Sequence, residues 1–218
     1  MASSSQTIEG RLLGSQVAID NSIADTVIQE CVAEYGYTAE KLTAAKTLCS
    51  NAQQLHQKQK AEYGDQYAAT EALNKAWEAA NAVYLPFVKV SRVALKAVPG
   101  GFQKLGLSGK RKASFSGWLT QANQFYVNGL ADANLLEKLA NFGITQEKLQ
   151  AGKQLVEAAE AAYNAQKKEM GEAQQATVER DNVLDDLDDW MSDFIAIARI
   201  ALTEKPQLLE KLGIVEKS

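Results

Sequence analysis

The chain has 218 residues, of which 46% are hydrophobic and 23% are charged, and its formal net charge is −4. These values are typical of a globular protein with an ordinary core, and they argue against a disordered chain or a strongly basic nucleic-acid-binding domain. Because only 3 prolines are present, the composition favours long helices over a loop-rich or all-β fold.

Neither a membrane span nor a secretory signal is recognisable in the sequence. The best apolar stretch, Phe194–Leu202, is far shorter than the ~20 residues needed to cross a bilayer and contains Arg199. The N-terminus has no basic region followed by an apolar segment. We therefore expect no membrane partner and a cytoplasmic location, unless the chain is a mature form or is exported by another route, including assembly on the cell exterior.

Residues 1–16 are predicted to form a separate N-terminal segment. Within it, Ile8–Arg11 spells the recognition sequence of a protease used to remove affinity tags, although no tag sequence precedes it. The segment is therefore either flexible native chain or a remnant of a tag, and the sequence leaves both interpretations open.

The rest of the chain contains an internal repeat with an offset of 107 residues. This offset aligns residues 35–107 with 142–214 without a gap, and 23 of the 73 aligned pairs are identical. Unrelated segments of this composition would give about five or six identities. The repeat indicates a tandem duplication and predicts these ranges: helical repeat 1 at 17–107, a linker at 108–117, and helical repeat 2 at 118–218.

Each repeat is expected to contain a short amphipathic stretch followed by a long helical one. The short stretches are Val17–Glu34 and Trp118–Asn141. Each long stretch begins at a threonine, Thr38 or Thr145, that follows a glycine by two residues and has the properties of an N-cap. Apolar residues then recur with heptad-like spacing, which predicts helices packed side by side at shallow angles.

Gly64 and Gly171 occupy equivalent positions within the long stretches. A glycine there either ends one helix of an antiparallel hairpin or lies inside a single helix of about 60 residues. We favour the single helix, because the heptad phase continues across both glycines and a glycine inside a helix costs only about 1 kcal/mol. The predicted fold is an all-α, pseudo-symmetric antiparallel helical bundle made from two tandem repeats with long heptad-patterned helices.

No catalytic, cofactor-binding or metal-binding residue is predicted, and we expect the protein not to be an enzyme. The single histidine, His56, falls on the apolar seam and is replaced by Tyr163 one repeat later. We interpret it as a packing residue, and without a second histidine neither a di-iron centre nor a histidine-rich zinc site can form. Cys31 and Cys49 are interpreted as free thiols that act as small core residues.

The two halves of the sequence carry opposite charge. Residues 1–112 hold 13 Lys and Arg against 10 Asp and Glu, a net of +3, whereas residues 113–218 hold 10 against 17, a net of −7. Drift, or attraction between the halves of one molecule, would explain this difference as well. We interpret it as a subunit whose basic end contacts the acidic end of its neighbour, a contact that builds rings or filaments.

The sequence therefore predicts a non-catalytic structural protein, a homo-oligomer that self-assembles head-to-tail into a filament or sheath. The alternative is an adaptor module that presents a helical face to a partner protein. Nucleic acid is not an expected partner, because the net charge is negative and no aromatic residues interleave the basic cluster. The predicted subunit contacts are the following: Lys89, Arg92, Lys96, Lys110, Arg111 and Lys112 on the basic side, and Asp185, Asp186, Asp188 and Asp189 on the acidic side.

Overall fold

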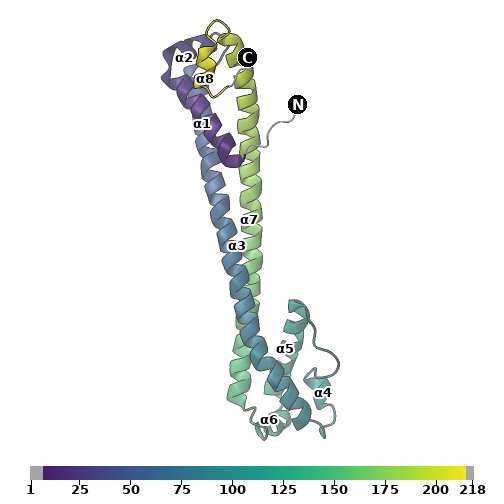
Figure 1. The fold of residues 1–218 in the computed structure, drawn as a ribbon. Helices are drawn as coiled ribbons and strands as arrows, with labels where there is room; N and C mark the ends of the chain where they lie inside the picture. The colour runs from purple at the N-terminus through teal and green to yellow at the C-terminus, as the bar shows by residue number, and fades with distance from the viewer. Residues whose placement is uncertain (1–6, 215–218) are drawn as a thin grey trace. The chain divides into compact units, whose positions relative to one another are not determined.

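The computed structural model describes residues 7–214. The described part of the chain is all-α, as predicted, with helices and turns and no β-strand (Figure 1). In chain order the helices are α1 (Ile8–Ala24), α2 (Thr26–Ala33), α3 (Ala39–Ala94), α4 (Gly101–Lys104), α5 (Phe115–Ala131), α6 (Ala133–Ala140), α7 (Gln146–Ala201) and α8 (Gln207–Lys211).

An aspartate divides each short amphipathic stretch into two helices, where the sequence pattern indicated one continuous stretch. Asp25 has extended backbone (φ −96°, ψ 109°), and its carboxylate accepts hydrogen bonds from two backbone N–H groups at the start of α2. Asp132 does the same at the start of α6. Each aspartate is thus an N-cap. The first helix of each pair, α1 or α5, also begins earlier than Val17 or Trp118.

The long helices α3 and α7 are continuous over 56 residues each and run through Gly64 and Gly171. The hairpin alternative is therefore wrong. A Cβ atom at either glycine would meet nothing within 4 Å, so neither glycine is required by close packing. Thr38 and Thr145 occupy the predicted cap positions, and each hydroxyl accepts a hydrogen bond of 3.4 Å from the N–H group three residues later.

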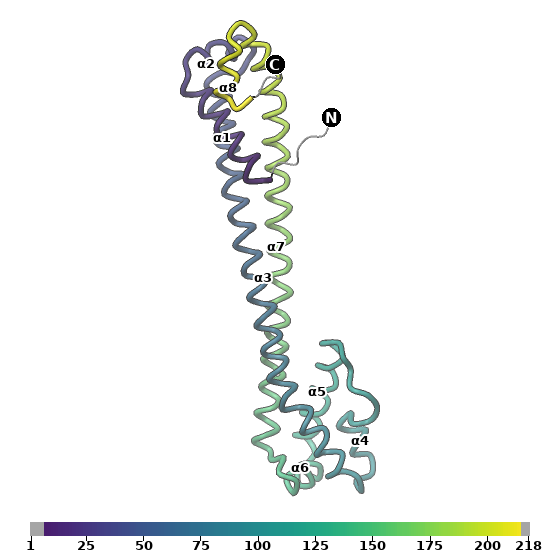
Figure 2. The backbone as a smooth tube through the Cα atoms, in the orientation of Figure 1, coloured from purple at the N-terminus to yellow at the C-terminus, as the bar shows by residue number. Residues whose placement is uncertain are grey.

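The chain is organised in two compact units. Unit 1 comprises residues 1–63 and 172–218, and unit 2 comprises residues 64–171. Unit 1 contains α1, α2, the first part of α3, the last part of α7, and α8, whereas unit 2 contains the other parts of α3 and α7 with α4, α5 and α6 (Figure 2). The predicted repeats 17–107 and 118–218 therefore each contribute helices to both units.

The core of unit 1 is mainly aliphatic. Ile19 of α1 and Leu42 of α3 leave 1% and 0% of their surface exposed. Tyr37 adds an aromatic contact with Trp190 and Phe194 of α7, at ring-centroid distances of 5.6 and 5.2 Å. Burial of a large apolar side chain contributes roughly 1.5–3 kcal/mol. Helices as short as α1 and α2 therefore depend on this packing, because they are marginal in isolation.

The core of unit 2 is richer in aromatic residues. Tyr84 of α3 and Tyr126 of α5 are fully buried, with ring centroids 6.2 Å apart. Trp118 is also buried and donates its indole N–H to the side-chain oxygen of Asn81 at 3.0 Å. Helix α7 approaches α5 closely at Gly152, where a Cβ atom would lie 2.5 Å from the hydroxyl oxygen of Tyr126.

Candidate interaction surfaces

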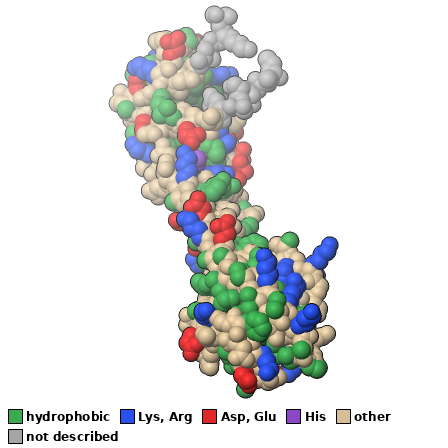
Figure 3. All heavy atoms as spheres, turned by 60° about the horizontal axis from the view of Figure 1, so that its bottom comes forward, with side chains coloured by type: hydrophobic (Ala, Val, Ile, Leu, Met, Phe, Trp, Pro, Cys, Tyr) green, Lys and Arg blue, Asp and Glu red, His purple; other side chains and the backbone are tan. Residues whose placement is uncertain are grey.

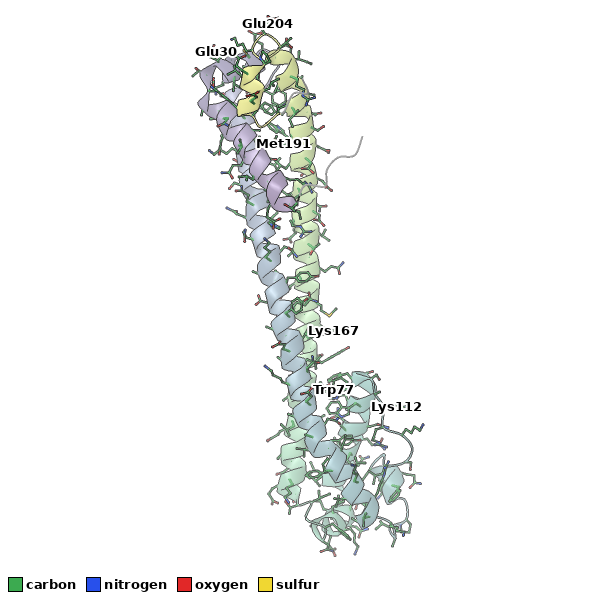
Figure 4. All side chains as sticks on the ribbon, in the orientation of Figure 1. Glu30, Trp77, Lys112, Lys167, Met191 and Glu204 are labelled. Carbon is green, nitrogen blue, oxygen red and sulfur yellow. The ribbon has the colours of Figure 1, made fainter. Side chains whose placement is uncertain are left out.

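All six basic residues predicted as subunit contacts belong to unit 2, on α3, just after it, and in the segment between α4 and α5. Four of them, Lys89, Lys96, Lys110 and Lys112, are exposed and form no ion pair with other described residues. Figure 3 shows Lys and Arg side chains gathered on one face of this unit, and Figure 4 shows Lys112 directed outward. These four lysines are available to an anionic partner.

The two arginines of the set are engaged within unit 2. Arg92 donates two hydrogen bonds to the carbonyl oxygen of Leu107, at 2.8 and 3.2 Å, and one to that of Gly109 at 3.3 Å. Arg111 donates to the hydroxyl of Tyr84 at 2.9 Å and to two carbonyl oxygens of its own segment. Both side chains therefore hold the segment 107–114 on unit 2, and their role as subunit contacts stays a prediction.

The acidic residues of the predicted set all lie on α7 in unit 1. Asp185, Asp186 and Asp189 are exposed and form no ion pair among residues 7–214. Asp188 is half-buried and differs from them, because it pairs with Arg11 of α1, with 3.2 Å between Arg11 Nε and Asp188 Oδ1. Asp188 thus joins α1 to α7, and its three neighbours are free to contact other molecules.

The two compact units carry opposite charge. Unit 2 contains 13 Lys and Arg against 9 Asp and Glu, a net of +4, and unit 1 contains 10 against 18, a net of −8. The difference between the units is 12 charges, compared with 10 between the sequence halves 1–112 and 113–218. The fold therefore separates charge more strongly than the order of the sequence does.

His56 lies in unit 1, beside a hollow of about 680 Å³ between α1 and α3. It is 5% exposed, and its Nε2 lies 3.2 Å from a carboxylate oxygen of Glu9. The pKa of Glu9 is lowered to about 2, first by its hydrogen bond with Lys60 and then by its own helix N-terminal N–H and by His56. Ser50 also lines the hollow. It precedes His56 by six residues on α3, a rise of about 9 Å, so the two do not form a nucleophile–base pair.

The two cysteines lie in the same unit as His56. Cys49 is buried, Cys31 is half-buried, and both are free thiols. Burial raises the pKa of the Cys49 thiol, which disfavours the reactive thiolate.

A second hollow of unit 1, which we call the α1–α7 groove, has a volume of about 630 Å³ and is lined by α1, α7 and residues around the end of α8. Leu13 and Val17 of α1 line it and are 62% and 39% exposed. Met191 and Arg199 line it from α7, and Figure 4 places Met191 beside α1.

Sequence analysis did not identify the α1–α7 groove. Leu13 belongs to residues 1–16, which were assigned to a segment outside the repeats. The exposed apolar pair Leu13 and Val17, four residues apart on one helix face, was the available signal.

Comparison with protein-family models, with curated proteins and with solved structures found no match. Among the described helices, none has an apolar stretch long enough to cross a membrane.

Proposed function

We propose that the chain is a tandem duplication whose two copies exchange helices, so that each compact unit combines the first part of one copy with the last part of the other. The helix bounds support this proposal. Helices α1, α2 and α3 begin and end 107 residues before α5, α6 and α7, respectively.

Equivalent side-chain contacts in the two units also support the duplication. In unit 1, Lys211 lies 2.8 Å from the carboxylate of Asp25, and its carbonyl oxygen accepts a hydrogen bond from Asn21. In unit 2, Lys104 lies 2.6 Å from the carboxylate of Asp132 and its carbonyl oxygen accepts a hydrogen bond from the equivalent asparagine, Asn128. Each contact joins the start of one copy to the end of the other, which is the pattern that a reciprocal exchange requires.

The role proposed for the whole chain is a non-catalytic structural subunit that self-assembles head-to-tail into a filament or sheath. The observation that carries this role is the charge separation between units, +4 against −8. Exposed lysines on unit 2 and exposed aspartates on unit 1 have no partner among the described residues, so contacts between copies would pair them. Such a contact is heterologous and repeats from one copy to the next. A homo-oligomer in the cytoplasm follows as part of the same proposal.

Sedimentation velocity and negative-stain electron microscopy test this role. Particle size is expected to grow with concentration at an ionic strength of about 0.01 M and to fall at about 0.1 M, where the Debye length is about 10 Å instead of about 30 Å. Uniform small particles under both conditions would exclude electrostatic self-assembly.

A pair of matched variants locates the contact. Reversal of three exposed aspartates on α7 should abolish assembly, whereas reversal of three other exposed carboxylates of unit 1 should preserve it. The test variant is Asp185→Lys with Asp186→Lys and Asp189→Lys, and the control is Glu30→Lys with Glu34→Lys and Glu204→Lys. Both change the net charge by six units, so an equal effect would mean that total charge, and not this surface, controls association.

The second candidate role is an interaction module for a partner protein, which the α1–α7 groove favours. Exposed apolar side chains next to charged groups are common at protein-binding sites. A module of this kind would remain a small particle at all salt concentrations in the sedimentation experiment.

A further inference from the structure

The α1–α7 groove of unit 1 is open, with no described segment across it. Its α1 wall exposes Leu13 and Val17, and Arg199 of α7 lines it without a hydrogen bond or an ion pair among residues 7–214. A guanidinium group offers five N–H donors. The groove therefore combines apolar surface with free donors, which suits a ligand that carries both apolar groups and carbonyl oxygens.

The equivalent surface of unit 2 is covered by the chain itself. Under the proposed duplication, three groove residues have counterparts 107 positions away that hold the segment 107–114: Gly14, Met191 and Arg199 correspond to Gln121, Tyr84 and Arg92. Gln121 accepts a backbone N–H of the segment at 2.9 Å, Tyr84 accepts a hydrogen bond from its arginine at 2.9 Å, and Arg92 donates to one of its carbonyl oxygens at 2.8 Å. Unit 2 thus shows how a peptide segment fills this surface.

The covering segment is non-helical and strongly basic. From Ser108 to Ser114 it reads Ser-Gly-Lys-Arg-Lys-Ala-Ser, with three consecutive cationic residues. Its chain turns at Gly106 and Gly109, whose φ angles of 61° and 73° favour glycine. Its backbone, and not only its side chains, is bound by the unit, because carbonyl oxygens and an N–H group all have side-chain partners.

The groove of unit 1 is better suited to a basic segment than its counterpart. Asp181, Asp185 and Asp188 follow one face of α7 at positions i, i+4 and i+7, and Asp188 lines the groove. The equivalent face of α3 in unit 2 carries a single carboxylate, with the residues Asn74, Glu78 and Asn81. Three carboxylates in place of one increase the attraction for cationic side chains.

We propose that the α1–α7 groove binds an extended basic peptide segment of a second protein. Leu13, Val17 and Met191 contact the backbone and apolar groups of the segment, and Arg199 donates to its carbonyl oxygens as Arg92 does in unit 2. Lysine or arginine side chains of the segment contact the carboxylates of α7. This inference rests on the duplication and not on self-assembly, and binding requires only one copy of the chain.

The test is a titration of the full-length, isotope-labelled protein with the peptide Ser-Gly-Lys-Arg-Lys-Ala-Ser, followed by amide chemical-shift changes. A peptide of the same length with glutamate at the three basic positions is the control ligand. We expect the basic peptide to shift amide signals of residues 10–17 and 188–199, and the control peptide to leave them unchanged. Absence of shifts from the basic peptide at millimolar concentration would overturn the proposal.

Two matched pairs of variants separate the groove from general charge. Gly14→Trp places an indole into open space, since a Cβ at Gly14 meets nothing within 4 Å, and should abolish binding, whereas Gly171→Trp should not. Removing two carboxylates of the acidic face should weaken binding about tenfold, because two partly exposed ion pairs are lost. The charge-matched control removes two carboxylates on the opposite side of α7. The pairs are Asp181→Asn with Asp185→Asn, and Asp186→Asn with Asp193→Asn.

Two further outcomes identify a different occupant and would overturn the proposal. If the peptide binds only after deletion of residues 215–218, the groove belongs to the chain's own C-terminal end. If Gly14→Trp abolishes self-association of the protein in sedimentation experiments, the occupant is a second copy. Peptide binding to the intact chain, with self-association unaffected by Gly14→Trp, supports a groove for a partner protein.

Discussion

The close approach of α7 to α5 at Gly152 gives a quantitative test of the packing in unit 2. Tyr126 is fully buried, and a Cβ atom on Gly152 would lie 2.5–2.6 Å from three atoms of its phenol group. Gly171, on the same helix, has nothing within 4 Å of an added Cβ. Replacement of either glycine by alanine adds the same methyl group to α7, so the surroundings alone distinguish the two variants.

The expected effects have opposite sign. Gly171→Ala should stabilise the protein by roughly 0.5–1 kcal/mol, which is the helix-propensity gain of alanine over glycine. Gly152→Ala receives the same gain but forces Tyr126 to move, and overpacking of this kind costs roughly 1–3 kcal/mol. The two variants should therefore differ by about 1–3 kcal/mol in the free energy of unfolding.

Urea denaturation measures this difference by circular dichroism and by tryptophan fluorescence. Trp77 and Trp118 report on unit 2 and Trp190 reports on unit 1, so the effect of Gly152→Ala should appear first in the fluorescence of unit 2. Equal stabilisation by both alanines would refute the close approach of Gly152 to Tyr126.

A double-mutant cycle extends this test of the packing. The positions in unit 1 that correspond to Tyr126 and Gly152 hold Ile19 and Ala45, both buried. Gly152→Ala should therefore cost less in a Tyr126→Ile background, with a favourable coupling of about 0.5–3 kcal/mol. A coupling near zero would contradict the proposed equivalence of the two pairs. Tyr126→Phe should cause no loss of stability, since the buried hydroxyl has no hydrogen-bond partner among the described residues.

Three further predictions concern acid, the paired arginines and the linker. The pKa values of Asp25 and Asp132 are lowered from 3.8, first by their lysine partners and then by capping N–H groups, so their contribution to stability is complete above that pH and is lost as the pH falls below it; Asp132→Asn should flatten acid unfolding curves in this range. Arg92→Ala should destabilise the protein by about 1–3 kcal/mol in urea, because three hydrogen bonds to carbonyl oxygens are lost, whereas Arg199→Ala should stay within about 0.5 kcal/mol. After cleavage at a protease site inserted behind Ala113, the two fragments should co-elute in gel filtration, and their separation without denaturant would contradict a fold in which both units contain helices of both fragments.

The long helices were predictable because their signals are local. Thr38 and Thr145 cap them, the heptad pattern continues through Gly64 and Gly171, and each of these features acts within a few residues along the chain. A glycine costs a helix about 1 kcal/mol, which a long apolar stripe outweighs. The hydrophobic pattern was therefore a better guide than the glycine.

The division into compact units was not predictable in the same way. Two copies with the same apolar pattern can pack within themselves or exchange partners, and similar sequences make both arrangements similar in energy. Contacts such as Lys211 with Asp25 decide between them, and these residues lie far apart in sequence. For the same reason Arg92 was interpreted as a surface contact, although its acceptors lie on a segment whose path depends on tertiary structure.

The composition of the two units has a consequence for the synthesis of the chain. Unit 2 is a continuous stretch, residues 64–171, whereas unit 1 joins the first 63 residues to those after 171. During translation unit 2 has all its residues while the last part of α7 is still absent, so α1 and α2 have only part of their packing surface at that stage. Leu42 and Ile19 are covered only when the C-terminal residues leave the ribosome. Nascent chains therefore expose the apolar faces of α1, α2 and α3 for longer than any other part, and this is the surface on which chaperones would act.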